Sequence, residues 1–414
     1  MTIFQVIATL VTLAAIFSFI NYRYIKFPTT IGLMALSLSV SLVMIAMEGV
    51  GWFSLDERAR SLLNSIDFYE TLMHGMLTFL LFAGALHVNL DDLRNQTLIV
   101  FLLATAGVLA STFLVGSMTW QALQLVDLNI PIMYCLLFGA LISPTDPIAV
   151  IGIMKKAGAP KSLETTITGE SLFNDGIGVV VFLVLLSFTG ESHHDAGLSD
   201  IGLLFVKEAI GGLLYGGGLG YLTYQMLKRV DNYQVEVLIT LATVTGGYAL
   251  AEALHVSAPL AIVVAGLLVG NHGRTFGMSE TTRIHLDTFW ELVDEVLNAV
   301  LFVLLGLEIL ILPHDFRIIL IGFMLIPVVL LARFIIVGST VTLVRRIREC
   351  SPGAIKIITW AGLRGGISVA LALSLPKSPE RDIIVTITYV IMVFSILVQG
   401  LSVGRLIDKC SVTR

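Results

Sequence analysis

The chain has 414 residues, of which 56% are hydrophobic and only 13% are charged, whereas a soluble domain carries about 25% charged residues. A soluble core of this size would need far more polar surface, so the composition excludes a soluble protein and indicates one whose solvent is largely lipid. The formal net charge of −5 comes without the basic patch that nucleic-acid binding requires, so we expect no nucleic-acid partner.

About 13 apolar segments follow one another along the chain, each long enough for a membrane-spanning helix of roughly 20 residues. They cover residues 3–21, 29–50, 67–86, 97–121, 130–155, 162–188, 201–228, 233–253, 256–270, 284–311, 317–344, 353–375 and 382–407. The first segment lacks a basic leader and a small-residue cleavage site, which favours a retained helix over a signal peptide. The charged stretch 52–66 predicts either an interfacial segment or a loop. We therefore predict an all-α polytopic membrane protein.

Basic residues concentrate in every second loop, as in Lys155-Lys156 and Arg345-Arg346. The positive-inside rule then predicts an N-terminus outside and a C-terminus in the cytoplasm. The three cysteines, Cys135, Cys350 and Cys410, are odd in number and widely spaced, so we expect neither a disulfide framework nor a metal site.

Two of the apolar segments contain helix breaks near their middle. Segment 130–155 contains Ser143-Pro144-Thr145-Asp146-Pro147, and two prolines three residues apart prevent a continuous helix. Segment 353–375 contains Gly362-Leu363-Arg364-Gly365-Gly366, a second break. They are the fifth and twelfth segments, so they cross the membrane in opposite senses. Broken helices at matching places in two inverted repeats predict a transporter binding site at mid-membrane.

Ionisable residues lie at the same predicted depth as the breaks. Asp175 lies near the middle of segment 162–188, level with Asp146 and Arg364. A charge at the bilayer centre costs at least ~2.5–3.5 kcal/mol, so these residues must pair or line a wet cavity. Asp175, with Ser171 one turn earlier and Asn174 beside it, offers the oxygens that a hard monovalent cation needs.

The neighbouring charges have alternative interpretations. Asp146 either binds the ion through water or caps the broken helix. Glu170 and Arg364 are interpreted as a structural ion pair that locks helices together. One carboxylate at mid-depth can hold a proton or a cation but not both, since burial favours its neutral form and a cation its charged form. Competition at that group predicts exchange, and one-for-one exchange would be electroneutral.

Four stretches together resemble the bacterial and archaeal Na⁺/H⁺ antiporters of the cation:proton antiporter-1 family, relatives of the animal Na⁺/H⁺ exchangers. They are Ile142 to Pro147, Gly169 to Asp175, Phe289-Trp290-Glu291-Leu292 with Leu305-Gly306-Leu307-Glu308, and Trp360 to Gly366. The resemblance runs nearly end to end. It implies a cell-membrane transporter that serves pH homeostasis, with two broken helices that cross.

The resemblance also implies a division of the chain into parts. Residues 1–96 and 231–312 would form the dimerisation domain of a homodimer, and 97–190 and 313–414 the transport core, with 191–230 as the linking helix. Transport would be an elevator-like movement of the core against the dimerisation domain.

At the site, the resemblance implies that Asp175 is the exchange carboxylate. Ser171, Asp146 and the main chain at Thr145 would complete the ion site, and Asn174 before Asp175 is similar to the electroneutral branch. One departure is that Phe82 is followed by Ala83, where the family often has a glutamate.

Acidic residues also gather at the start of segment 284–311: Glu291, Asp294 and Glu295, followed by Asn298. They either favour the positive helix N-terminus as solvated charges or form a cytoplasmic funnel or a pH-responsive cluster.

Three other functions stay open beside Na⁺/H⁺ antiport. K⁺/H⁺ antiport would use the same oxygens, with Li⁺ as a further substrate, and a cation channel or sensor could share the scaffold. An enzyme would need Asp146 and Asp175 as an aspartyl pair, and the sequence has neither a Gly-Xaa-Ser-Xaa-Gly nor a His-Glu-Xaa-Xaa-His motif. We therefore predict a transporter, not an enzyme, with no cofactor and no metal beyond the transported cation. Its partners would be Na⁺, K⁺ or Li⁺, protons, the lipid bilayer and a second copy of the chain.

Overall fold

The computed structural model describes residues 3–50, 68–189, 198–274, 277–313, 315–347 and 351–411. The predicted interfacial or loop stretch 52–66 and Cys350 lie outside them. In these residues the secondary structure is helical, and the one β-type pairing is a single bridge between Asp146 and Leu363. The prediction of an all-α fold is confirmed.

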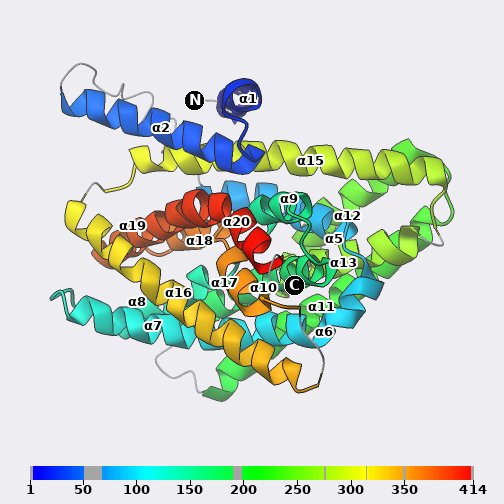
Figure 1. Ribbon diagram of the computed structural model, residues 1–414. Helices are drawn as coiled ribbons and strands as arrows, with labels where there is room; N and C mark the ends of the chain where they lie inside the picture. The colour runs from blue at the N-terminus through cyan, green and yellow to red at the C-terminus, as the bar shows by residue number, and fades with distance from the viewer. Residues whose placement is uncertain are drawn as a thin grey trace.

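The first half of the chain forms ten described α-helices (Figure 1). They are α1 (Ile3–Ile20), α2 (Thr29–Gly49), α4 (Phe68–Glu70), α5 (Thr78–Leu86), α6 (Leu90–Leu102), α7 (Val108–Gln124), α8 (Ile132–Ile142), α9 (Ile148–Lys156), α10 (Lys161–Ser187) and α11 (Leu198–Leu227). Wider π-helical turns continue or join them at η1 (Asn21–Ile25), η2 (Thr71–Leu77) and η3 (Leu103–Gly107).

The second half of the chain forms eight described α-helices. Its helices are α12 (Tyr233–Ala253), α13 (Ala258–Leu268), α15 (Glu280–Leu307), α16 (Phe316–Arg345), α17 (Ala354–Ala361), α18 (Gly366–Leu373), α19 (Pro379–Phe394) and α20 (Gly400–Ser411). The π-helical turns η5 (Val269–Gly273) and η7 (Ser395–Gln399) extend α13 and join α19 to α20, and the 3₁₀ turn η6 (Glu308–Leu310) follows α15.

Eight helical runs among the described residues are long and apolar enough to cross a membrane. They cover 4–25, 29–48, 68–86, 90–124, 161–187, 233–253, 316–345 and 379–410. The runs 132–142 and 258–273 are apolar but shorter. The multi-pass architecture is thereby confirmed, while the count of about 13 spans stays a prediction.

Several helices begin earlier than hydropathy predicted, because polar caps start them before the apolar run. Asn89 accepts hydrogen bonds from the amides of Asp91 and Asp92, so α6 begins seven residues before the predicted 97. Ser279 accepts one from Thr282 at the start of α15. Such caps satisfy amides that have no partner inside the helix, and they carry no hydropathy signal.

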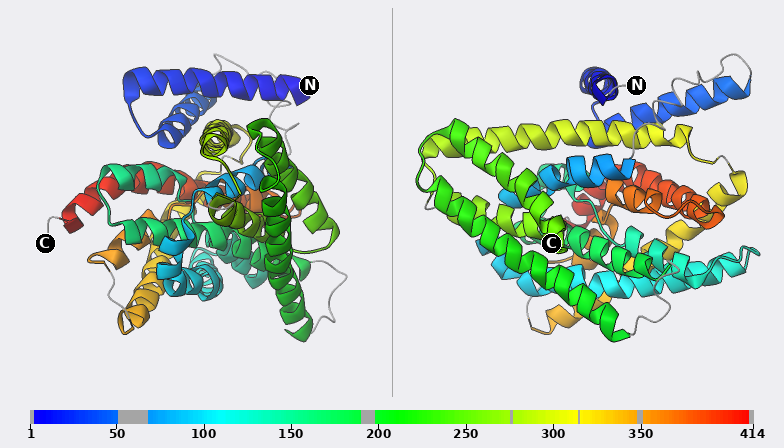
Figure 2. Two further views of the ribbon diagram at one scale, coloured as in Figure 1. Left: turned by 90° about the vertical axis from the view of Figure 1, so that its right-hand side faces the viewer. Right: turned by 180° about the vertical axis from the view of Figure 1, so that it is seen from behind.

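The helices pack in two sets, which Figures 1 and 2 show from three directions. In one set α2 runs along α15 with α1 against both, and α5, α11 and α12 surround α13. In the other, α7 pairs with α8, and α16 with α19, around α10 and α18. Close approach between α2 and α15 depends on Gly306, where an added Cβ would lie 1.9 Å from Ser37 Oγ.

The two predicted breaks lie at the predicted residues and cross each other. The chain is extended between α8 and α9 and between α17 and α18, and the amide of Asp146 donates to the carbonyl of Leu363 at 2.8 Å. The bridge is antiparallel, so the two broken segments run in opposite senses, as predicted. An added Cβ on Gly365 would lie 2.7 Å from Asp146 Cβ, so the crossing needs glycine there.

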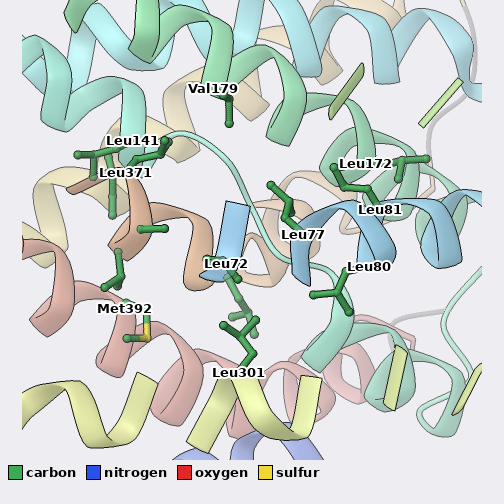
Figure 3. Close-up of a cluster of buried hydrophobic side chains, with 14 of the residues drawn as sticks. Leu72, Leu77, Leu80, Leu81, Leu141, Leu172, Val179, Leu301, Leu371 and Met392 are labelled. Carbon is green, nitrogen blue, oxygen red and sulfur yellow. The ribbon is translucent and has the colours of Figure 1, made fainter. Parts of the chain in front are cut away.

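Apolar side chains from distant parts of the chain surround this crossing. Figure 3 shows Leu77 and Leu81 from the run 71–86, Leu172 from α10, Leu301 from α15 and Leu371 from α18 around the extended strand. All five are at least nine-tenths buried. The polar crossing therefore sits inside an apolar shell.

Candidate cation site

Helix α10 carries the predicted exchange carboxylate at the centre of the fold. Ser171 and Asp175 are four residues apart and so share a face of the helix. Asp175 is 8% exposed, and its carboxylate makes no hydrogen bond within the described part of the chain. A carboxylate without a protein partner is available for a proton or a cation.

Thr145, in the extended strand between α8 and α9, is fixed to α10 by three polar contacts. Its hydroxyl lies 3.0 Å from Ser171 Oγ and accepts from Asn174 Nδ2 at 2.9 Å. Its amide donates to Asn174 Oδ1 at 3.4 Å. Asn174, predicted as an ion ligand, therefore joins α10 to the broken helix. The Thr145 carbonyl accepts no hydrogen bond from the described residues.

Asp146 caps the broken helix, one of its two predicted roles. Its Oδ1 accepts from the amide of Ile148 at 2.9 Å, in the first turn of α9. It is half-buried and lies within electrostatic range of Asp175. Its role as a water-mediated ligand stays a prediction.

A cavity of about 790 Å³ reaches these groups from the surface. Thr145, Asp146, Ser171 and Asp175 line its inner part. Lys155, at the end of α9, and Lys161, at the start of α10, line its mouth, where Lys161 Nζ lies 2.6 Å from Asp92 Oδ2. The cavity can therefore bring water and ions to Asp175.

The acidic residues predicted at a helix start lie in the middle of α15, because this helix begins at Glu280, and they line the opposite wall of the same cavity. Glu291 and Glu295 are exposed, and Asp294 is half-buried. Ala83 and Gly84 of α5 line it too, so the position at which the family often has a glutamate does face the ion path.

The predicted pair between Glu170 and Arg364 is wrong in its basic partner. Glu170 Oε1 pairs with Arg333 Nη1 of α16, and both side chains are more than nine-tenths buried. Arg364 instead donates from Nη1 to the carbonyls of Ser143 at 2.7 Å and Pro144 at 3.1 Å.

The reason lies in the broken helix. A helix would satisfy the Ser143 carbonyl through the amide of residue 147, but Pro147 has no amide hydrogen. Arg364 supplies the missing donors, because the two breaks cross at this point. One feature of the sequence pointed to Arg333 as a paired residue, namely that it is a basic residue inside an apolar span. No feature of the sequence pointed to Ser368 of α18, which is buried and also lines the cavity.

Comparison with known proteins agrees with this arrangement. A sequence profile described as "Sodium/hydrogen exchanger, transmembrane" matches residues 8–409. The chain is 50% identical to the Na⁺/H⁺ antiporter NhaP of Pseudomonas aeruginosa, over 98% of this chain and 96% of that one. It is 34% identical to the Na⁺/H⁺ antiporter NhaH of Halobacillus dabanensis, over 94% and 93%.

A solved structure supports the same fold. The sodium proton antiporter MjNhaP1 from Methanocaldococcus jannaschii superposes with a TM-score of 0.76 over 99% of both chains, at 19% identity. The profile match across almost the whole chain and the similarity to NhaP show that this protein belongs to the transmembrane sodium/hydrogen exchanger family.

Proposed function

We propose that the chain exchanges Na⁺ for H⁺ across a membrane, one for one, at Asp175. The relatives named as Na⁺/H⁺ antiporters support the reaction. The observation that carries the assignment of the site is the Asp175 carboxylate, which has no partner among the described residues and lies at the inner end of a wide cavity.

The ligands around Asp175 suit a hard cation. Arg364 occupies the carbonyls of Ser143 and Pro144, and this leaves the carbonyl of Thr145 available beside the hydroxyl of Ser171. Carboxylate, carbonyl and hydroxyl oxygens are the ligands that replace the hydration shell of such an ion. K⁺ and Li⁺ would use the same atoms.

The charges at the crossing favour an electroneutral cycle. Among the described residues there, the positive Arg333 and Arg364 balance the negative Glu170 and Asp146. Asp175 is then the one unbalanced charge. Because an unpaired charge is costly inside a membrane, the core would move when Asp175 holds a proton or a cation.

The cost of moving an unpaired charge through the membrane also gives a reason for alternating access, in which one set of helices moves against the other. In our proposal α6–α10 and α16–α20 form the transport core, and α1, α2, α4, α5, α12, α13 and α15 form the dimerisation domain of a homodimer. The cavity lies between the two sets, because α15 and α5 supply one wall and α9, α10 and α18 the other. Movement of one set against the other would close it.

The experiment is proton flux in proteoliposomes under an imposed pH gradient with the potential clamped. Na⁺, K⁺ and Li⁺ are added in turn to the wild type, to Asp175→Asn, and to Asp231→Asn as an exposed control outside the cavity. We expect Na⁺-driven flux that is lost in Asp175→Asn, retained in Asp231→Asn and independent of the potential. Flux that survives Asp175→Asn would overturn the site, and flux that follows the potential would overturn electroneutrality.

A further inference from the structure

Helix α15 carries a polar stripe, and three of its residues, Glu291, Asp294 and Glu295, line the cavity on the wall opposite Asp175. Glu291, Asp294, Glu295 and Asn298 lie at spacings of three and four residues, which places them on one face of the helix. Their burial increases along the helix, from the exposed Glu291 and Glu295 through the half-buried Asp294 to Asn298, which is 3% exposed. The stripe thus leads inward.

Two buried oxygen atoms, one at the inner end of this stripe and one on α18, have no hydrogen-bond partner among the described residues. Asn298 lies one helical turn after Asp294 and next to its carboxylate, and its Oδ1 is buried with no hydrogen bond from the described residues. Ser368 Oγ is also buried without a partner, on a residue that lines the same cavity. Buried polar groups are normally paired, so two unpaired oxygens, one next to the Asp294 carboxylate and one in the lining of its cavity, favour a ligand that is a Lewis acid.

The packing brings the two helices that carry these oxygens together. Leu301, one turn after Asn298 on α15, would contact a Cβ on Gly366 of α18 at 3.0 Å. Gly366 lies two residues before Ser368. Figure 3 shows Leu301 extending from α15 toward this region.

The carboxylates of the cavity form a series that leads to Asp175. Asp294 lies within electrostatic range of Asp146, and Asp146 within range of Asp175. His87 is within range of Asp294, and one of its ring nitrogens, Nδ1, bonds to the carbonyl of Ala83 at 2.8 Å. The mutual repulsion of three carboxylates favours a cation among them.

We propose that Asp294, Asn298 Oδ1 and Ser368 Oγ bind a monovalent cation at a second site, on the α15 side of the cavity. Carboxylate, amide and hydroxyl oxygens repeat the ligand chemistry expected at Asp175. The site takes the cation from the mouth and passes it to Asp175. This role as a waiting site rests on the proposed function, but binding at the site does not.

Binding is tested without transport, in an Asp175→Asn background that removes the first site. Purified protein is heated with NaCl or with choline chloride at equal ionic strength, and the midpoint Tm is compared. We expect Na⁺ to raise the Tm of Asp175→Asn by several degrees, and Asp175→Asn/Asp294→Asn to lose that rise. Glu280→Gln, the same change at an exposed position on α15, should keep it.

Ser368→Ala separates binding from folding. Because the Ser368 hydroxyl has no hydrogen-bond partner in the described part of the chain, its removal should leave the Tm without Na⁺ unchanged and reduce the Na⁺-dependent rise. The second site is overturned if Na⁺ does not stabilise Asp175→Asn, or if the rise is unaffected by Asp294→Asn.

Transport tests the relay. With the Asp175 carboxylate intact, Asp294→Asn should raise the KM for Na⁺ about tenfold and change the maximal rate less than twofold, also at high ionic strength, where long-range attraction is screened. If the increase in KM caused by Asp294→Asn disappears in high salt, the stripe attracts cations only through long-range electrostatics, and the relay is overturned. If the wild type shows no flux, the proposed function fails, and the Tm measurements still decide whether the second site exists.

Discussion

At the scale of single residues, the three charges Glu170, Arg364 and Asp175 around the crossing differ in whether the protein already satisfies them. Glu170 contacts Arg333, Arg364 contacts two backbone carbonyls, and Asp175 has no partner among the described residues. Glu170 and Asp175 are both carboxylates on α10, but they lie on different faces of the helix. Glu170 therefore has a structural role, and Asp175 stays free to bind a proton or a cation.

Replacement of Arg333 by leucine should destabilise the protein severely. It leaves Glu170 buried without its cation, and the loss of one partner of a buried pair costs about 3–5 kcal/mol. The double variant Glu170→Gln/Arg333→Leu should recover most of the loss, because it removes the unpaired charge. The measurement is the free energy of unfolding in a double-mutant cycle.

A matched cycle between Glu170 and Arg364 provides the comparison. We expect a coupling energy that is clearly smaller than the one between Glu170 and Arg333. A larger coupling would restore the predicted pair between Glu170 and Arg364.

At the scale of elements, the two broken helices depend on each other. Each break frees backbone groups, and the crossing satisfies them: the amide of Asp146 meets the carbonyl of Leu363, and Arg364 of the second break meets the carbonyls of the first. In lipid such groups have no water to bond with, so neither break would be stable without the other.

Gly365→Ala should disrupt the crossing, because the new Cβ would lie 2.7 Å from that of Asp146. Backbone or side chain must shift, at a cost of about 1–3 kcal/mol, and the displaced Asp146 should lower the transport rate at least tenfold. The control is Gly338→Ala in α16, where the nearest atom is 4.0 Å away and where we expect wild-type flux. Equal flux in the two variants would contradict the requirement for close approach.

A second pair of elements is held by a histidine between two carboxylates. His74 Nδ1 lies 2.6 Å from Glu70 and Nε2 2.8 Å from Glu252, so η2 is tied to α12. The groups are partly exposed, and such exposed pairs contribute about 0.2–1 kcal/mol each. His74→Gln should therefore lower stability by no more than about 1–2 kcal/mol, and a larger loss of Tm would show that the tie is stronger than its exposure suggests.

At the scale of the whole molecule, the cavity is open at the end where Lys155 and Lys161 lie. If the basic loops face the cytoplasm, as the positive-inside rule predicts, the structure is open to the inside. Because the cavity lies between the two helix sets, the way these sets are placed relative to each other decides from which side of the membrane ions reach Asp175.

Cysteine labelling tests this access. In a background with Cys135, Cys350 and Cys410 replaced by serine, Glu291→Cys at the cavity mouth should react with an impermeant maleimide from the cytoplasmic side alone. Asp382→Cys, in the first turn of α19, is the control for the outer side. Labelling of Glu291→Cys from outside would reverse the predicted topology.

Much of the site could be predicted from local sequence. The prolines at 144 and 147 and the glycines around Arg364 placed both breaks at the right residues, because proline and glycine act on their own backbone. The group of Ser171, Asn174 and Asp175 was recognisable because neighbours on one helix turn share a face. The start of α6 was missed, since the cap at Asn89 contributes nothing to hydropathy.

The sequence by itself determined the lipid-facing composition, the helical class, the two breaks and the carboxylate at Asp175, since all of these depend on residues close together in the chain. The tertiary structure alone decided that Arg333 pairs with Glu170, that Arg364 bonds to the carbonyls beside Pro147, and that Asp294 and Ser368 line the cavity of Asp175. These contacts join helices far apart in sequence, and the angle at which packed helices cross, which no local pattern encodes, sets which side chains meet.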